Sequence, residues 1–161
     1  ESLCAAYASE YGINSKVLRL TQTFGSGVEY NDGRVFAEFA RCAIEKRNIV
    51  LKTKGETERC YLDISDAVSA ILTVLLYGKI GEIYTAANEE TYCSIYEMAK
   101  LVAEMNGIDV EIKEQDISKS GYANTLYMDL DTSKLRNLGW EPVVGLEDSI
   151  KKLIDYMKGL S

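Results

Sequence analysis

The sequence predicts an α/β fold, and three observations favour it. Short apolar runs rich in β-branched residues, such as 16–21 and 81–86, are typical of strands. Longer segments in which apolar residues recur at three and four positions, such as 34–45, are typical of amphipathic helices. The two kinds of segment alternate over 161 residues without a repeat, and 47% of the residues are hydrophobic, which suffices for one domain with its own core.

Glycines and polar turns bound the elements expected in the first half of the chain. The opening segment 1–11 has good helix formers and stops at Gly12, and because it lacks an initiator Met we expect a helix entered midway. Two short apolar runs flank the polar turn 54–57 and predict a hairpin or strand pair with a ligand-facing loop. In order, we expect a helix over 1–11, a strand over 16–21, a loop over 22–33, a helix over 34–45, and strands at 49–51 and 60–62.

Helix caps organise the second half. Ser65 is the expected N-cap of a helix that stops near Gly78. Ser94 and Glu97 have the spacing of a capping box for a helix that Gly107 ends. The other expected elements are strands at 81–86 and 110–112, an irregular polar stretch over 115–125, a short helix from 131 closed by 139–142, and a last helix with Leu146, Ile150, Leu153, Ile154 and Met157 on one stripe.

Charge and hydropathy exclude several classes of partner. The chain has 25 acidic and 18 basic residues, a formal net charge of -7 and no basic block, so we expect neither nucleic acid nor an anionic membrane as partner. It also lacks an apolar run long enough to span a bilayer and a signal-peptide pattern at its start. We therefore expect a cytoplasmic protein, in which a local pocket can still bind a small anion.

The four cysteines do not predict a metal site. They are widely spaced, form no C-x-x-C pair, and the chain has no histidine to join them. Because each lies in an apolar stretch, buried free thiols are favoured over disulfides. The cysteines are Cys4, Cys42, Cys60 and Cys93.

Two motifs resemble known catalytic patterns but are better explained otherwise. Tyr96 and Lys100 lie four residues apart, like the tyrosine base and its lysine partner in short-chain dehydrogenases. Their helix follows a capping box, however, and its apolar face is explained by packing. Gly25-Ser26-Gly27 lacks a third glycine at dinucleotide spacing and no helix follows at once. We expect neither catalytic residues nor a dinucleotide fingerprint in this chain.

Arg59 is the strongest candidate for a ligand contact. It follows the polar turn 54–57, which contains Gly55. It is the first residue of the sequence Arg59-Cys60-Tyr61-Leu62-Asp63-Ile64-Ser65-Asp66. A guanidinium there can offer a planar, bidentate fork to a diphosphate. Taken alone, a surface salt bridge explains the arginine about as well.

The order of the motifs resembles the second half of the extended short-chain dehydrogenases, the NAD-dependent nucleotide-sugar epimerases and dehydratases. The departures from the family pattern include Gln22 in place of Asn, Ser26 in place of Pro and Asp63 in place of an aromatic residue or His. The matching pieces, in order, are Tyr11-Gly12-Ile13 with Val17-Leu18-Arg19-Leu20, Phe24-Gly25, the helix that begins at Arg34-Val35, the segment 49–55, the Arg59-to-Asp66 motif, Gly81-Glu82-Ile83-Tyr84, and Leu138-Gly139-Trp140-Glu141-Pro142.

The resemblance implies a Rossmann-type α/β fold in which this chain is the C-terminal, substrate-binding part. Residues 1–161 would form one region, with 1–21 and 82–87 packing against an NAD-binding domain that carries the glycine fingerprint and the catalytic Tyr and Lys. The full-length enzyme would be a homodimer, whereas this chain alone would be inactive. The resemblance leaves open 4-epimerase or 4,6-dehydratase, and which nucleotide and sugar are used.

The family's binding residues map onto a few positions of this sequence. Arg59 would bind the diphosphate of a nucleoside-diphosphate sugar, Gln22 the sugar-phosphate side, and the segment from Leu51 to Gly55 the base. Arg34 is a further substrate-binding candidate, and Thr21 and Gln22 would lie beside NAD. The alternative is a non-catalytic acidic α/β interaction or assembly domain, with Arg59 in a structural ion pair.

Overall fold

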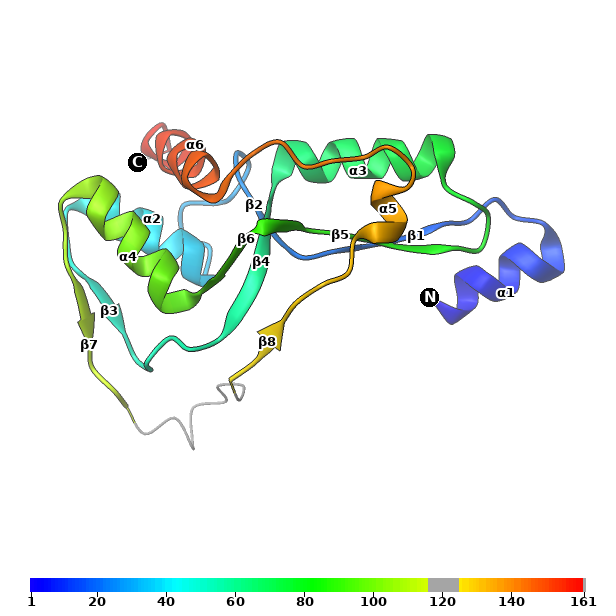
Figure 1. The fold of residues 1–161 in the computed structure, drawn as a ribbon. Helices are drawn as coiled ribbons and strands as arrows, with labels where there is room; N and C mark the ends of the chain where they lie inside the picture. The colour runs from blue at the N-terminus through cyan, green and yellow to red at the C-terminus, as the bar shows by residue number, and fades with distance from the viewer. Residues whose placement is uncertain (116–124, 161) are drawn as a thin grey trace.

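The structure of the protein, a computed structural model, describes residues 1–115 and 125–160 (Figure 1). Helices and strands alternate within these residues, which confirms the α/β class. The stretch expected to be irregular, 115–125, lies almost wholly outside them. The helices are α1 (Ser2–Tyr11), α2 (Val35–Glu45), α3 (Ile64–Tyr77), α4 (Ile95–Asn106), α5 (Ser133–Arg136) and α6 (Leu146–Lys158).

The described strands form three sheets. Strands β1 and β5 pair in parallel, as do β3 and β7. In the third sheet β4 is central: it runs parallel to β2 and β8 and antiparallel to β6. The strands are β1 (Val17–Leu20), β2 (Gln22–Phe24), β3 (Ile49–Leu51), β4 (Glu58–Asp63), β5 (Ile83–Ala86), β6 (Asn88–Ser94), β7 (Val110–Ile112) and β8 (Tyr127–Met128).

The parallel pair β1–β5 diverges at its carboxyl end. One residue, Thr21, separates β1 from β2, and one residue, Ala87, separates β5 from β6. Beyond these residues β4 lies between β2 and β6. The backbone N–H of Thr21 donates to Ala86 (3.1 Å) and its hydroxyl donates to the carbonyl of Cys60 (2.7 Å), so Thr21 fastens both sheets where they part.

Two hydrophobic cores hold these layers. The larger lies among α2, α4, α6 and the strands they cover, at the end of the molecule opposite α1 (Figure 1). The smaller packs α3 and α5 against β4 and β5, and Trp140 of the late motif belongs to it. Side chains buried in the larger core include Phe24, Phe36, Phe39, Ile49, Tyr61, Met98, Val102, Ile150, Leu153 and Met157.

The Arg59-to-Asp66 motif and the late motif are fastened to each other. Asp66 is 2% exposed, and its carboxylate accepts the backbone N–H groups of Val143 (3.1 Å) and Val144 (3.0 Å). The indole N–H of Trp140 donates to the hydroxyl of Ser69, one turn along α3 (2.9 Å). Two motifs about 80 residues apart therefore form one hydrogen-bonded unit, which holds the start of α3 in place.

Several predicted elements and caps are confirmed, and one cap is wrong. Ser94 and Glu97 form the capping box of α4, and Gly12 and Gly107 end α1 and α4 in the left-handed conformation. The N-cap of α3 is Asp63 and not Ser65. The Asp63 carboxylate accepts the N–H of Ser65 (2.8 Å), and the helix begins at Ile64.

The strand predictions need four corrections. The segment 22–33, expected as a loop, begins with β2, and neither β6 nor β8 was predicted. The strands at 49–51 and 60–62 do not form a hairpin, because β3 pairs with β7 and β4 pairs with β2. Parallel partners lie far apart in sequence, so the polar turn between β3 and β4 does not decide how they pair.

Helices α1 and α3 both leave large apolar side chains exposed. No residue of α1 is buried. One side of α3 packs on the smaller core, while its other side exposes large apolar side chains. These exposed residues are Ile64, Val68, Ile71, Leu72, Leu75, Leu76 and Tyr77.

The four cysteines are free thiols. Cys42 and Cys60 are buried as expected, whereas Cys4 and Cys93 are partly exposed. Across 1–115 and 125–160 the structure holds no group of three or more His, Cys, Asp or Glu residues that could bind a metal ion. No helix there is both long enough and apolar enough to cross a membrane.

Candidate functional site

Arg59 and Gln22, predicted from the sequence to share a ligand, are in contact. Arg59 is the second residue of β4, and its Nη1 donates to Oε1 of Gln22 at 2.8 Å. Gln22 is the first residue of β2 and stands opposite Tyr61 in the β2–β4 register. The strand pairing thus brings together two side chains 37 residues apart in sequence.

Arg59 also differs from every other arginine of the chain. The sequence has six arginines, and five of them pair with a carboxylate: Arg19, Arg34, Arg41, Arg47 and Arg136. Arg59 has no carboxylate at ion-pair distance among the described residues, and its Nε is buried without a hydrogen-bond partner there. Arg59 is half-buried, and a polar N–H shielded from water without an acceptor is unfavourable, so this position is suited to an anionic ligand.

The contact lies where the carboxyl ends of parallel strands open. Thr21 and Gln22 directly follow β1, at the point where β1 and β5 part around β4. In open α/β sheets, ligands bind outside the carboxyl ends of the strands where neighbouring connections diverge. Thr21, expected beside NAD, and Gln22 are therefore placed at the edge where such folds bind ligands.

The segment predicted to bind the base lines a cleft of about 840 Å³. Leu51, Gly55 and Thr57 line it, whereas Arg59 and Gln22 do not. The cleft combines apolar side chains with backbone polar groups. Its walls include Val35, Phe39, Leu51, Ile95, Glu38, Arg41, Glu114, Gln115, Thr125 and the loop 52–57.

Gly55 is required by the backbone that forms this cleft. Its φ is +71°, a left-handed conformation, and a Cβ at this position would lie 2.9 Å from the backbone nitrogen of Tyr96. That same nitrogen donates to the carbonyl of Gly55 at 3.1 Å. The close approach fixes the loop to the start of α4 and leaves no space for a side chain.

Arg34 lies in a different cleft from Leu51 and Gly55. A second hollow of about 460 Å³ is lined by Asp32, Arg34, Ile64 and the loop 23–29. Gly33 and Val35 face the larger cleft, so alternate residues before α2 face opposite sides. The guanidinium of Arg34 is held by Asp32 (Nη2 to Oδ2, 2.6 Å) and lies over the ring of Phe36. The structure therefore does not bring Arg34 together with Arg59.

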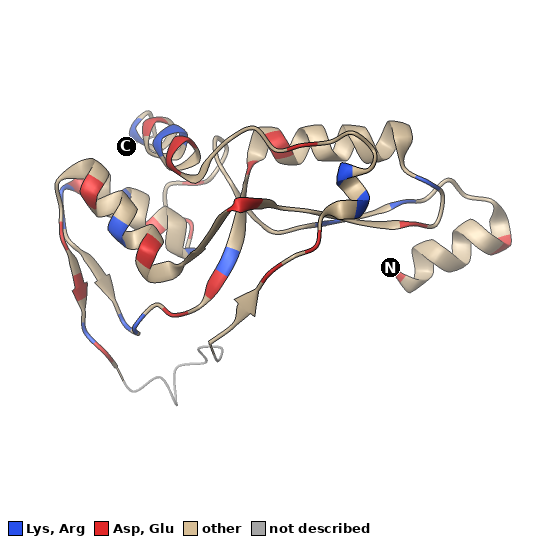
Figure 2. Ribbon diagram, in the orientation of Figure 1, with Lys and Arg blue, Asp and Glu red and all other residues tan. Residues whose placement is uncertain are grey.

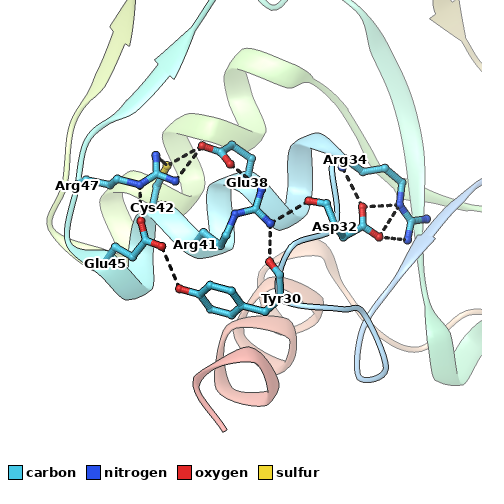
Figure 3. A network of polar contacts seen from close by, with 8 residues as sticks. All are labelled: Tyr30, Asp32, Arg34, Glu38, Arg41, Cys42, Glu45 and Arg47. Atoms are coloured by element: carbon cyan, nitrogen blue, oxygen red, sulfur yellow. Dashed lines mark hydrogen bonds and ion pairs between the residues drawn. The ribbon is translucent and has the colours of Figure 1, made fainter. Parts of the chain in front are cut away.

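Arg41 and Glu38 line the larger cleft but were not predicted as site residues. Arg41 donates through Nη1 to the carbonyls of Tyr30 (2.5 Å) and Asp32 (2.8 Å) and through Nη2 to Glu38 (2.6 Å) (Figure 3). Their opposite charges three residues apart on a helix indicate a surface pair. Nothing in the local sequence shows that the loop 52–57 packs beside them.

The same network continues along α2 (Figure 3). Arg47 donates to Glu45 (2.6 Å), to Glu38 (2.9 Å) and to the thiol of Cys42 (2.8 Å). Burial raises the pKa of Cys42 to about 11, so the thiol is protonated near neutral pH. Burial also acts to raise the pKa of Glu38, but hydrogen bonds from Arg41 and Arg47 outweigh it and lower that pKa.

Tyr96 and Lys100, which have the spacing of a catalytic pair, contact other residues. Lys100 pairs with Glu104 one turn along α4 at 3.7 Å, and Tyr96 contributes its backbone N–H to Gly55. Both side chains are exposed. Figure 2 shows Lys and Arg scattered among Asp and Glu along the chain, so an anion would be held by individual cations and not by a basic surface.

Comparison with known sequences identifies the family. The model of the NAD dependent epimerase/dehydratase family matches residues 1–87. UDP-glucuronic acid decarboxylase 1 of Xenopus tropicalis is 30% identical over 98% of this chain and 37% of that protein, and its Danio rerio counterpart is 32% identical over 97% and 36%. The human dTDP-D-glucose 4,6-dehydratase is 26% identical over 98% of this chain and 45% of that protein. The chain thus spans about a third to a half of the length of these relatives.

Solved structures share the fold. UDP-glucose 4-epimerase of Thermotoga maritima, solved with UDP-glucose, gives a TM-score of 0.84 at 24% identity, over 99% of this chain and 50% of that one. The dTDP-glucose 4,6-dehydratase of Bacillus anthracis, solved with NAD, gives 0.82 at 20% identity, over 98% and 49%. The predicted Rossmann-type α/β fold is confirmed, and the motif order read from the sequence agrees with the family match. This chain belongs to the NAD dependent epimerase/dehydratase family.

Proposed function

We propose that this chain is the substrate-binding part of an NAD-dependent enzyme that acts on a nucleoside-diphosphate sugar. Arg59 binds the diphosphate, with Gln22 at the same end of the site. The observation that carries the proposal is that Arg59, alone among six arginines, lacks a carboxylate partner in the described part of the chain. A diphosphate supplies the missing charge in a geometry that a guanidinium matches.

The base binds in the larger cleft. Leu51 and Gly55 line it, Phe39 and Val35 offer apolar surface to a planar ring, and the loop 52–57 offers backbone donors and acceptors. Arg59 lines neither cleft, but Thr57 of the cleft lies two residues before it, so the diphosphate would extend from the cleft along β4 to reach Arg59. Arg34 is a weaker candidate, since it reaches a ligand only if its pair with Asp32 opens.

NAD would be held chiefly outside this chain. The loop with Gly25 and Gly27 does not fit a pyrophosphate turn, because α2 begins only at Val35 and no helix N-terminus follows the glycines directly. Thr21 and Gln22, at the carboxyl end of β1, are the residues proposed to border the cofactor. When bound, NAD supplies hydride transfer at the sugar ring.

The chain's own residues contribute orientation. Contacts with the nucleotide and diphosphate are remote from the reacting carbon, so their binding energy aligns the sugar for a step that other groups perform. The relatives include dehydratases, 4-epimerases and decarboxylases, and these residues favour none of the three. We propose that the chain alone has no oxidoreductase activity.

The alternative, a non-catalytic acidic domain, requires Arg59 to be a structural ion-pair partner. Within the described residues it forms no such pair, and its hydrogen bond goes to a neutral amide. The family match also favours the enzyme.

A calorimetric titration of the full-length protein with UDP and with uridine tests the role of Arg59. Charge-assisted hydrogen bonds are worth about 1.5 to 3 kcal/mol, so Arg59→Ala should weaken UDP binding by roughly tenfold to a hundredfold and leave uridine unchanged. Arg47→Ala removes an ion-paired arginine that lines neither cleft, and it is the matched control. Unchanged UDP affinity in Arg59→Ala would refute the assignment.

We further propose that 1–21 and 82–87 pack against an NAD-binding domain, and that α3 shares this contact. The lack of buried residues in α1 and the exposed apolar side of α3 support this. The isolated chain should then self-associate and bind a dye for apolar surfaces, and Leu72→Glu with Leu76→Glu should reduce both. A monomeric sedimentation profile without dye binding would contradict the proposal. The homodimer and the cytoplasmic location stay predictions.

A further inference from the structure

We propose that Gln22 acts as a positioning residue for Arg59, holding the guanidinium while leaving its charge for the ligand. This inference rests on the proposed function and assigns to Gln22 a role through Arg59 instead of direct contact with the substrate. Gln22 thereby sets the preference of the site for an anion.

Arg59 binds its protein partner through a different edge of the guanidinium than Arg19 and Arg34 do. Arg19 holds Glu1 through Nε (2.7 Å) and Nη2 (2.6 Å), and Arg34 holds Asp32 through the same two nitrogens. Arg59 uses Nη1 for Gln22, and in the described residues its Nε has no partner. Gln22 therefore leaves without a carboxylate the edge that binds one in Arg19 and Arg34. Because Nε is shielded from solvent, an anionic oxygen reaches it only when neighbouring side chains shift.

Gln22 is placed on a fixed backbone. Its neighbour Thr21 donates from its N–H to Ala86 (3.1 Å) and from its hydroxyl to Cys60 (2.7 Å). The hydroxyl of Thr23 donates to the carbonyl of Thr21 at 3.0 Å. Since Gln22 itself pairs with Tyr61 across β2 and β4, its amide approaches Arg59 from a strand that β4 holds in register.

The chemistry of an amide explains why this residue type suits the position. A carboxamide oxygen accepts a hydrogen bond but carries no charge, whereas the acceptors of the other five arginines include a carboxylate. A carboxylate at position 22 would neutralise Arg59 and compete with the diphosphate. A residue without an acceptor would leave the long side chain free to rotate, which costs affinity when the ligand orders it.

Titrations of the full-length protein with UDP test this role. Gln22→Met keeps the length of the side chain and removes the acceptor, and it should weaken UDP binding by roughly threefold to tenfold. Gln22→Glu should weaken it about as much as Arg59→Ala without lowering the melting temperature, because the new ion pair stabilises the fold. Gln22→Asn keeps the amide but shortens the reach, so its affinity should fall between those of the wild type and Gln22→Met.

The double variant separates positioning from direct contact. If Gln22 acts only through Arg59, Gln22→Met combined with Arg59→Ala should bind UDP no more weakly than Arg59→Ala alone. Asn31→Asp adds the same charge as Gln22→Glu at an exposed residue that lines neither cleft, and it is the matched control, expected to bind UDP as the wild type does.

The outcomes distinguish the two proposals. Additive losses in the double variant would show that Gln22 contacts the ligand itself and overturn the positioning role. Unchanged affinity in both Gln22→Met and Gln22→Glu, with a loss in Arg59→Ala, would overturn it as well while leaving the proposed function intact. Unchanged affinity in Arg59→Ala would overturn the proposed function first.

Discussion

Arg59 on β4 differs from Arg41 and Arg47, two arginines at α2, in the charge of the groups that hold it. Arg41 of α2 and Arg47, two residues after the helix ends, share Glu38, and Arg47 also binds Glu45, so positive and negative charges balance within this group (Figure 3). On β4, the partner of Arg59 is the neutral amide of Gln22, which does not balance the positive charge of the arginine. Arg41 and Arg47 hold the chain to itself, whereas in the proposed function Arg59 uses its charge to bind another molecule.

Figure 3 shows what the paired arginines achieve. Arg41 is mostly buried and binds two backbone carbonyls in the loop before α2, which ties that loop to the helix wall of the larger cleft. Each of its contacts ends on a group of this chain. The comparison therefore predicts that loss of Arg59 changes ligand affinity, whereas loss of the α2 arginines changes stability.

The largest effect that sharpens this comparison is expected for Arg59→Lys. An ammonium keeps the charge but cannot offer two coplanar donors, so UDP affinity should fall by about tenfold or more, close to the loss in Arg59→Ala. Calorimetric titration checks the affinity, and thermal unfolding should show a melting temperature near that of the wild type. Full affinity in Arg59→Lys would mean that charge alone matters and that the free guanidinium edge has no role.

The sequence predicted Arg59 and the segment from Leu51 to Gly55 as candidates, but not the helix residues that line the larger cleft. Arg59 and the segment from Leu51 to Gly55 belong to motifs whose residue types carry a chemical meaning, so they could be predicted without coordinates. Glu38 was missed, because its closeness to the loop 52–57 depends on how α2 packs beside β3. Arg34 was predicted with the others, yet the alternation of residues before α2 turns it toward the second cleft.

The fold shows the same limit. Elements bounded by local signals, such as the capping box of α4 or Gly12 after α1, could be predicted. The strand β2 could not, because three residues in a glycine-rich segment carry no pattern, and their pairing with β4 comes from residues 39 positions away in the register. The hairpin expected at 54–57 was wrong for the same reason, since both strands pair with distant parallel partners.

The next largest effect is expected for Arg41→Ala, measured as the free energy of unfolding. The change leaves two carbonyls without their side-chain donor and removes one of the two arginines that bind Glu38, in a partly buried place, so stability should fall by about 1 to 3 kcal/mol. Denaturant unfolding with an unchanged m-value checks it. If the loss is no larger than that in an exposed ion pair, the loop before α2 does not depend on Arg41.

A smaller effect is expected for Arg47→Ala. Its side chain and those of Glu38 and Glu45 are each about 40% exposed, and exposed ion pairs contribute roughly 0 to 1 kcal/mol. UDP affinity should stay at the wild-type value, since Arg47 lines neither cleft. Comparing the losses of unfolding free energy in Arg41→Ala and Arg47→Ala therefore shows how much more a buried arginine of the network stabilises the fold than an exposed one. Equal losses would contradict this expected difference.

The smallest effect concerns pH, and it separates the two kinds of arginine by their partners. Hydrogen bonds from Arg47 and then Tyr30 lower the pKa of Glu45, and the pKa of Glu38 is also lowered, because its hydrogen bonds to Arg41 and Arg47 outweigh its burial. A carboxyl group whose pKa is lower in the folded state stabilises the fold above its unfolded pKa, near 4.3, and loses that contribution as the pH falls through the folded pKa. The α2 network should thus weaken below about pH 4.5, whereas the amide of Gln22 does not titrate there. The free energy of unfolding, measured from pH 7 to pH 3, should show the difference between the wild type and Glu38→Gln with Glu45→Gln shrinking as the pH falls. Glu10→Gln, at an exposed position, corrects for the loss of a negative charge elsewhere. A difference that stays constant or grows toward acid would mean that these carboxylates do not stabilise the folded chain through their charge, and the contrast with Arg59 would then rest on geometry alone.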